Sequence, residues 1–279
     1  MELYHHISHN ISRLFTRKYS TSFSLGIAAF AKKYRQPVYD IYGYVRVADE
    51  IVDSFTDYDR KPLLLEFREE TFRAIERGVS TNPVIHAFQE TVRTYNVDLN
   101  HIREFLDSME MDLYNSYYEK DRYDDYIYGS AEVVGLMCLK VFVDGNQEMY
   151  DKLELPAKAL GSAFQKVNFL RDMKSDLAER GRIYLPGIGD VVGIDDESKR
   201  RLEDEIEKEF SHALQGIRQL PAGVRLGVYS AYLYYYQLFN IIKKSKVKTL
   251  LERRVRVSNT AKFFLLLKSF LEVKVLKVC

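Results

Sequence analysis

The chain has 279 residues, a net charge of +1 and 46% hydrophobic residues. This composition supports a sizeable core and gives no general case for nucleic-acid binding. The start M-E-L-Y-H-H lacks a signal-peptide layout, and no apolar run approaches the ~20 residues of a membrane span. Cys138 and Cys279 form no metal-ligand spacing. We therefore expect a cytoplasmic protein, soluble or peripheral to the inner face of the membrane.

Helical spacing of apolar residues dominates the first half of the chain. Only 6 Pro and 14 Gly interrupt the sequence, which favours long helices over short strands. The predicted helices cover residues 3–18, 38–55, 62–78, 84–94 and 99–118. The hydroxyl-rich stretch Y-S-T-S-F at 19–23 offers capping side chains for a following helix.

The second half continues the helical pattern. Residues 123–143 are apolar on nearly every side after Ser130, which is typical of the buried centre of a bundle. Further helices are predicted over 151–180, 197–219 and 222–245, and the Pro- and Gly-rich segment 182–196 is predicted to be a loop. The last stretch, 249–278, ends in a basic apolar tail. No internal repeat or linker is visible. The prediction is a single all-α domain over residues 1–279.

Two acidic pairs stand out, Asp49/Asp53 and Asp172/Asp176. Each pair has four-residue spacing, so on a helix both carboxylates project from one face. Like charges at this spacing destabilise a helix, which favours a positive group between them. Magnesium is the natural candidate, because it binds one or two carboxylates together with substrate phosphates.

The second pair is part of a longer polar stripe. Gln165, Asn168, Asp172 and Asp176 follow steps of three, four and four, which place all four side chains on one helical face. By itself this stripe fits a solvated face equally well. If it is buried, the four groups need ions or hydrogen bonds to satisfy them.

The first pair also has companions in helical phase. Tyr42 and Arg46 precede Asp49 and Asp53 by steps of four and three. Arg46 is either half of a surface ion pair with Asp49 or a guanidinium fork for a diphosphate beside the metal.

Taken together, the two motifs resemble the squalene/phytoene synthase family, the head-to-head trans-isoprenyl diphosphate synthases. The most specific part is L-G-S-A-F-Q-K-V-N-F-L-R-D-M-K-S-D-L-A-E-R-G-R-I-Y-L-P at 160–186, which includes Arg182, Tyr184 and Pro186. The segments 19–23, 42–53, 109–113, 126–135 and 252–258 follow in the family's order. The resemblance covers nearly the whole chain and is greatest to bacterial phytoene synthases.

The resemblance implies a helical bundle of the isoprenoid synthase type with a central active-site cavity. It implies the 1'-1 joining of two identical prenyl diphosphates through a cyclopropylcarbinyl diphosphate, in carotenoid biosynthesis. Two geranylgeranyl diphosphates giving phytoene are favoured. Squalene or dehydrosqualene synthesis from C15 substrates is the alternative, and NADPH is needed only if the product is squalene. No glycine-rich dinucleotide motif is present.

The family pattern also assigns roles to residues of this chain. Two or three Mg²⁺ ions are expected on Asp49, Asp53, Asn168, Asp172 and Asp176. The catalytic set is expected to be Asp49, Asp53, Asp172, Asp176, Tyr42 and Arg46. Substrate contacts are expected from Tyr19, Ser20, Thr21, Ser22, Tyr42, Arg46, Gln165, Arg171 and Tyr236.

Some positions depart from the family pattern. Tyr19 and Thr21 stand where many relatives carry His and Lys, and Glu50 stands where a third aspartate is common. Glu132 replaces a small residue in an apolar stretch, which affects the expected shape of the cavity. None of these changes removes an outer aspartate of either pair.

Two further alternatives remain open at the level of sequence. Some relatives have abandoned catalysis and act as assembly or scaffold proteins, but the aspartates, Arg46 and Asn168 are all present here. The basic, amphipathic tail beginning at 243 fits either a final packed helix or peripheral contact with an anionic membrane.

Overall fold

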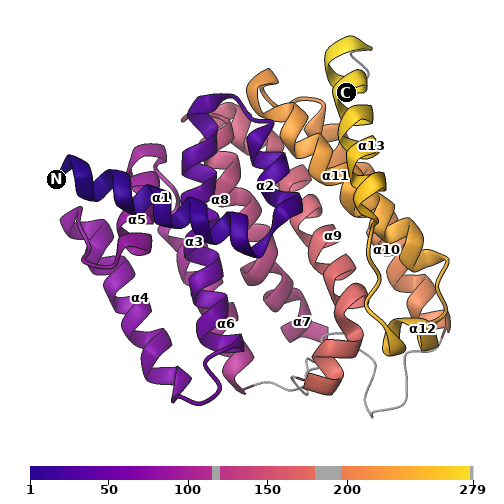
Figure 1. Ribbon diagram of the computed structural model, residues 1–279, viewed down its shortest axis with the longest axis horizontal. Coiled ribbons are helices and arrows are strands. Elements are labelled where there is room, and N and C mark those ends of the chain that lie inside the picture. The colour runs from indigo at the N-terminus through magenta and orange to yellow at the C-terminus, as the bar shows by residue number, and fades with distance from the viewer. Residues whose placement is uncertain (115–119, 180–195, 277–278) are drawn as a thin grey trace.

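The computed structural model describes residues 1–114, 120–179, 196–276 and 279, and every regular element in these ranges is helical (Figure 1). The α-helices are α1 (Glu2–Tyr19), α2 (Thr21–Ala28), α3 (Lys32–Asp53), α4 (Arg60–Arg77), α5 (Pro83–Tyr95), α6 (Leu99–Tyr114), α7 (Lys120–Ile127), α8 (Val133–Phe142), α9 (Gln147–Glu179), α10 (Asp196–Ile217), α11 (Ala222–Lys243), α12 (Val247–Glu252) and α13 (Asn259–Phe270). Two π-helical segments, η1 (Tyr128–Glu132) and η2 (Leu271–Val275), complete the set. The all-α prediction is confirmed for the described residues.

Local signals in the sequence set several helix ends. The Ser20 side chain accepts a hydrogen bond from the Phe23 amide at 3.2 Å, so the predicted cap of α2 is confirmed. Asn82 caps α5 in the same way through the amides of Val84 and Ile85. Gly78 ends α4 with a φ of 78°, in the left-handed region that favours glycine.

Helix α3 begins at Lys32, six residues before the predicted start at residue 38. Pro37 lies inside this helix and removes one backbone hydrogen bond. The flanking Tyr34 and Val38 are both buried, so packing of this turn outweighs the missing bond. The extension places α3 against α1, α5 and α8.

The apolar stretch predicted as one helix is divided into α7, η1 and α8. The π-helical turns of η1 pack closely on α6, because a Cβ on Gly129 would lie 2.5 Å from the Glu104 carbonyl oxygen. Gly161 of α9 meets η1 on another side, where its Cβ would lie 2.8 Å from the Ala131 oxygen. Glycine at both positions allows these close approaches, and π-turns of this kind frequently mark functional sites.

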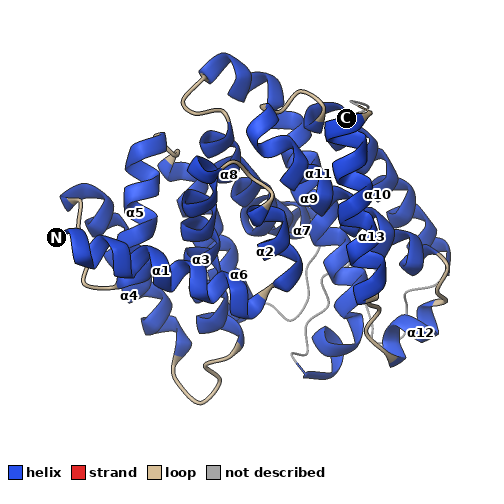
Figure 2. Ribbon diagram, turned by 45° about the horizontal axis from the view of Figure 1, so that its top comes forward, coloured by secondary structure: helices blue, strands red, loops and turns tan. Residues whose placement is uncertain are grey.

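The C-terminal region consists of short helices joined by an extended segment. Helix α12 ends at Glu252, and an extended segment leads to α13, which lies beside α11 (Figures 1 and 2). Val255 and Val257 alternate inward and are buried, which anchors this segment. The predicted loop 182–196 lies outside the described residues, except that α10 starts at Asp196. In the described ranges, no helix has the length and hydropathy that a membrane span requires.

Candidate active site

Both acidic pairs face a cavity of about 610 Å³. The cavity is lined by residues of α1, α2, α3, α6, α7, η1, α9, α11 and α13, and by the segment between α12 and α13. Most of the residues singled out in the sequence line it: Tyr19, Ser20, Ser22, Tyr42, Arg46, Asp49, Asp53, Gln165, Asn168, Arg171, Asp172 and Asp176. The polar stripes of α3 and α9 therefore meet at one site and are not solvated faces.

On α3, the Arg46 guanidinium forms ion pairs with Asp49 and Glu50, one helical turn further along. The same guanidinium lies 4.3 Å from the centre of the Tyr19 ring. The Arg46–Asp49 ion pair that the sequence suggested is present. Both residues line the cavity, so this is not an ion pair of the outer surface. Glu50 does not line the cavity, so its ion pair holds the Arg46 guanidinium from outside the cavity lining.

On α9, two arginines from different parts of the chain converge on Asp172. The Nε atoms of Arg171 and Arg254 lie 3.0 Å and 2.7 Å from Asp172 Oδ1. Asp176, one turn further along α9, is buried. Guanidinium groups of the protein thus place positive charge beside Asp49 and Asp172, one member of each acidic pair.

A chain of hydrogen bonds orients the amides of the α9 stripe. Gln165 donates to the Ser130 hydroxyl of η1 at 3.2 Å, and its own oxygen faces the Asn168 amide at 3.5 Å. Tyr235 of α11 donates its hydroxyl proton to Asn168 Oδ1 at 3.2 Å. The half-buried amides of Gln165 and Asn168 thus find hydrogen-bond partners on η1 and α11.

Tyr42 lines the cavity on α3, one turn before Arg46. Its ring stacks on Phe23 with 4.8 Å between centroids. Burial raises the pKa of its phenol and outweighs the lowering effect of Arg46, so Tyr42 keeps its proton at neutral pH. A protonated phenol at the cavity wall can donate a hydrogen bond to an anion.

The remaining wall is apolar and aromatic, with Val45, Phe105, Met109, Tyr126, Phe169, Leu265 and Leu266. Asp112 also lines the cavity, and its carboxylate accepts the Tyr126 hydroxyl proton at 2.9 Å. Glu132, whose charge was expected to affect the cavity, is not among the lining residues. The cavity combines a charged region with walls suited to an apolar chain.

Two of the predicted substrate contacts, Tyr236 and Thr21, are not among the residues that line this cavity. Tyr236 does not line the cavity, because its hydroxyl donates to Glu207 on α10 at 2.6 Å. Helix α11 turns Ala231, Tyr234 and Tyr235 toward the cavity, and Tyr236 lies about 100° further round. Thr21 is also absent from the lining. The predicted positions Arg182, Tyr184 and Pro186 lie outside the described residues.

Sequence reasoning missed several lining residues that carry polar groups, among them Tyr235, Arg254 and Lys262. The phase of α11 would have favoured Tyr235 over Tyr236, had the cavity face of that helix been known. Arg254 reaches Asp172 from the extended segment between α12 and α13, and its only signal was the basic stretch 252–258.

The donor atoms at the cavity suit a hard divalent cation. Asp49, Asp53, Asn168, Asp172 and Asp176 supply only oxygen ligands, the type that Mg²⁺ prefers over nitrogen and sulfur. Three of these side chains come from α9 and two from α3, so a cation with a bridging phosphate would join the two helices.

The helical fold with this cavity defines a protein of the isoprenoid synthase class. The squalene/phytoene synthase family model matches residues 16–188. The 15-cis-phytoene synthase of Synechocystis sp. is 31% identical over 96% of this chain and 86% of its own length. The phytoene synthase of Arthrospira platensis is 30% identical over 86% of this chain and 85% of its own length. The chain belongs to the squalene/phytoene synthase family.

Solved structures agree on the fold. A dehydrosqualene synthase solved with a ligand superposes with a TM-score of 0.82 at 22% identity, covering 97% of this chain and 98% of the other. A squalene synthase from Alicyclobacillus acidocaldarius gives a TM-score of 0.74 at 23% identity, covering 85% and 93%.

Proposed function

We propose that this protein joins two identical prenyl diphosphates head to head, using two geranylgeranyl diphosphates to make phytoene through a cyclopropylcarbinyl diphosphate. The observation that carries the proposal is the meeting of both aspartate pairs, flanked by arginines, in one cavity with aromatic walls. The phytoene synthases at about 30% identity support the C20 substrate.

Asp49, Asp53, Asn168, Asp172 and Asp176 would hold magnesium. When bound, the metal neutralises a leaving diphosphate and stabilises it as an anion. The fit of the site to this ion rests on its all-oxygen donor set and on the absence of nitrogen or sulfur donors among these five side chains.

The protein's own groups bind and position the diphosphates. Arg46, Arg171 and Arg254 present guanidinium forks that match phosphate oxygens in a bidentate way. Ser22 and Tyr42 add hydroxyl donors at the same wall. Each of these arginines now contacts a carboxylate, so each exchanges that partner for phosphate when substrate binds.

The apolar walls protect the allylic cation that forms when diphosphate leaves. Phe105, Tyr126 and Phe169 present aromatic rings to the cavity, and ring faces stabilise cations while excluding water that would quench them. Asp112 is the acidic residue beside these rings, and its carboxylate accepts a hydrogen bond from the Tyr126 hydroxyl.

The test is incubation of purified protein with Mg²⁺ and either geranylgeranyl or farnesyl diphosphate, each with and without NADPH, followed by product identification. Phytoene from the C20 substrate without NADPH is expected. Formation of dehydrosqualene from the C15 substrate, or of squalene when NADPH is present, would show that the substrate is C15 and not C20. Absence of turnover with both substrates would favour a non-catalytic scaffold role.

We also propose peripheral membrane contact through α13. Phe263 and Phe264 are each 65% exposed, and Leu267 and Phe270 are exposed beside them, while Leu265 and Leu266 line the cavity. Basic side chains on α13 and the segment before it complement an anionic surface. An apolar product formed behind α13 would then leave next to lipid.

Liposome pelleting tests this contact. Binding to anionic vesicles is expected to fall when Phe263 and Phe264 are both replaced by Ser, and to weaken with salt. Leu155→Ser, at an exposed leucine on α9, is the matched control. Equal binding of the double variant, or binding to neutral vesicles only, would contradict the proposal.

A further inference from the structure

A cluster of histidines and carboxylates lies between α1, α3 and α5, and none of its members lines the active-site cavity. His5 Nδ1 lies 3.0 Å from His86 Nε2 and 3.0 Å from Glu90 Oε1. His86 Nε2 lies 3.9 Å from Glu90 Oε2. One ligand atom from each of the three residues falls within 4.8 Å of the others, and no ion is present.

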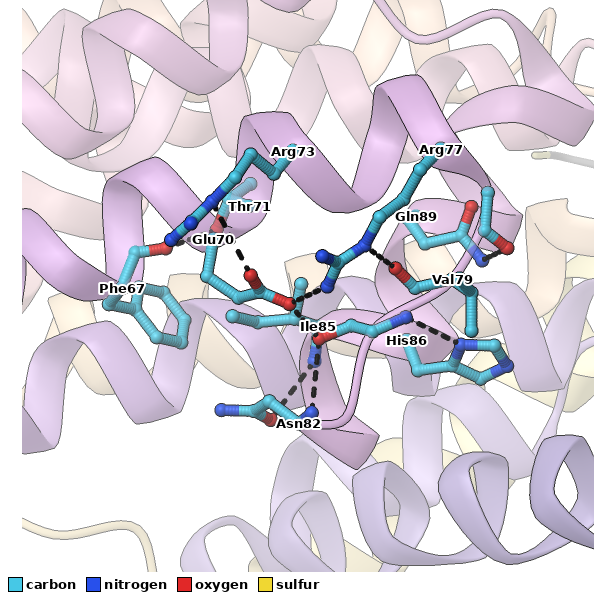
Figure 3. Close-up of polar contacts among 12 residues, drawn as sticks. Phe67, Glu70, Thr71, Arg73, Arg77, Val79, Asn82, Ile85, His86 and Gln89 are labelled. Atoms are coloured by element: carbon cyan, nitrogen blue, oxygen red, sulfur yellow. Dashed lines mark hydrogen bonds and ion pairs between the residues drawn. The ribbon is translucent and has the colours of Figure 1, made fainter.

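Protons alone do not satisfy these three groups. The Ser80 amide donates to His86 Nδ1 at 3.2 Å, beside the α4–α5 connection (Figure 3). In a neutral imidazole the proton is then on His86 Nε2, which points at His5 Nδ1. His5 Nδ1 must therefore offer a lone pair, yet it also faces the Glu90 carboxylate, which offers only lone pairs. A cation between the three would accept all of them.

The second oxygen of the Glu90 carboxylate faces His9. Glu90 Oε2 is buried and makes no hydrogen bond of normal geometry, although His9 Nε2 lies 3.2 Å away. His9 Nδ1 contacts Asp40 Oδ2 at 2.9 Å, and the fully buried Asp40 also accepts from Gln36 and Thr91. This second layer fixes His9 against Glu90, as outer carboxylates and histidines do around metal ligands.

We propose that His5, His86 and Glu90 form a second divalent-metal site, selective for Zn²⁺, that joins α1 to α5. Two imidazole nitrogens and one carboxylate suit Zn²⁺, whereas Mg²⁺ prefers oxygen ligands alone. His5 and Glu90 are each about one third exposed in their side chains, which gives the ion a path from solvent. Binding moves the His86 proton from Nε2 to Nδ1, which breaks the hydrogen bond from the Ser80 amide and requires these two N–H groups to move apart.

The site is tested on tag-free full-length protein that has been treated with chelator and then supplied with excess Mg²⁺ to occupy the active-site aspartates. Zn²⁺ titration by calorimetry, with Co²⁺ absorption as a spectroscopic probe, is expected to show one site. His5→Gln and Glu90→Gln should each weaken it about 100-fold or more, and His9→Gln by about 10- to 100-fold. Zn²⁺ should also raise the melting temperature of the wild type and not that of Glu90→Gln.

His6→Gln is the matched control, because His6 is exposed on the same helix and has no part in the cluster. It should bind Zn²⁺ like the wild type, and Asp172→Ala should do so as well. Circular dichroism confirms that each variant is folded. Unchanged Zn²⁺ affinity in folded His5→Gln and Glu90→Gln, or loss of the site in Asp172→Ala, would overturn the assignment.

Discussion

At the residue scale, the aspartates of the cavity are held by ion pairs that a bound substrate would replace. Asp172 is the most heavily engaged, because Arg171 and Arg254 both contact its carboxylate. Removing its charge leaves two guanidinium groups without their partner and takes one oxygen ligand from the proposed metal site. The effect of this change on catalysis can be measured separately from its effect on folding, because solvent in the open site can solvate the released guanidinium groups.

For Asp172→Asn we expect turnover to fall by about 10³-fold, because the lost stabilisation of the leaving group is several kcal/mol. Steady-state kinetics with geranylgeranyl diphosphate and Mg²⁺ measures this effect. Asp204→Asn, at an exposed aspartate on α10, should leave kcat within about twofold. Retention of normal kcat in Asp172→Asn would contradict its role.

The neighbouring tyrosines of α11 separate a cavity role from a packing role. Tyr235→Phe removes the hydrogen bond to Asn168 and should lower kcat/KM by about 10-fold, in line with about 1 kcal/mol for one such bond. Tyr236→Phe removes the bond to Glu207 on α10 and should lower the free energy of unfolding by about 1 kcal/mol with kcat/KM unchanged. Urea unfolding and steady-state kinetics on both variants measure these effects. A lower kcat/KM in Tyr236→Phe, with kcat/KM unchanged in Tyr235→Phe, would assign the cavity role to Tyr236.

At the element scale, η1 packs against both α6 and α9 and contributes Ser130 to the cavity wall. Its Ser130 contacts Gln165, while its Glu132 is partly buried away from the cavity. Burial, with a contribution from Glu209, raises the pKa of Glu132 to about 7. A family position that is usually small thus carries a carboxyl that the fold prefers to keep protonated.

This raised pKa makes stability depend on pH in a definite direction. Because the folded state holds the Glu132 proton more tightly than the unfolded state, its contribution is complete below pH ~4.5 and is lost as pH rises toward 7. Glu132→Gln should therefore be more stable than the wild type by about 1 kcal/mol at pH 8, after allowance for partial exposure, and nearly equal at pH 4.5. Urea unfolding across this range measures the difference.

Glu148→Gln, at an exposed glutamate near the start of α9, is the control and should track the wild type at every pH. A constant difference between Glu132→Gln and the wild type would show that Glu132 does not titrate in this window.

At the scale of the whole molecule, the proposed metals link α3 to α9, which are far apart in the sequence. Mg²⁺ with inorganic diphosphate should raise the melting temperature by about 5 °C at saturating concentration, whereas either one alone should raise it less. Scanning calorimetry measures this, with Asp49→Asn and Asp172→Asn as variants in which the joint effect is lost. An equal shift from diphosphate alone would argue against a metal bridge.

Much of this arrangement could be predicted from sequence, for identifiable physical reasons. Caps such as Ser20 and Asn82 and the left-handed Gly78 act locally, so helix ends near them were found. The start of α3 was missed because burial of Tyr34 and Val38 outweighs a local signal from Pro37. Tertiary packing, which single-sequence patterns do not contain, decided that case.

The same division holds for the site. Four-residue spacing placed the aspartates on shared faces, and the family pattern supplied their companions. Tyr236 was chosen by counting along the chain, whereas the structure turns its hydroxyl toward Glu207 on α10. Arg254 reaches Asp172 only because Val255 and Val257 anchor an extended segment, a path that composition does not reveal.

The pairing of Arg46 with Asp49, and of Arg171 and Arg254 with Asp172, balances much of the charge of the site within the protein itself. Under the proposed function, substrate binding would exchange these partners, with carboxylates taking up cations while guanidinium groups take up phosphate. Few dissolved ions are displaced, so affinity should vary with ionic strength less steeply than the number of charges suggests. Run in reverse, the exchange compensates the departure of diphosphate, and a tightly held leaving group can still be released.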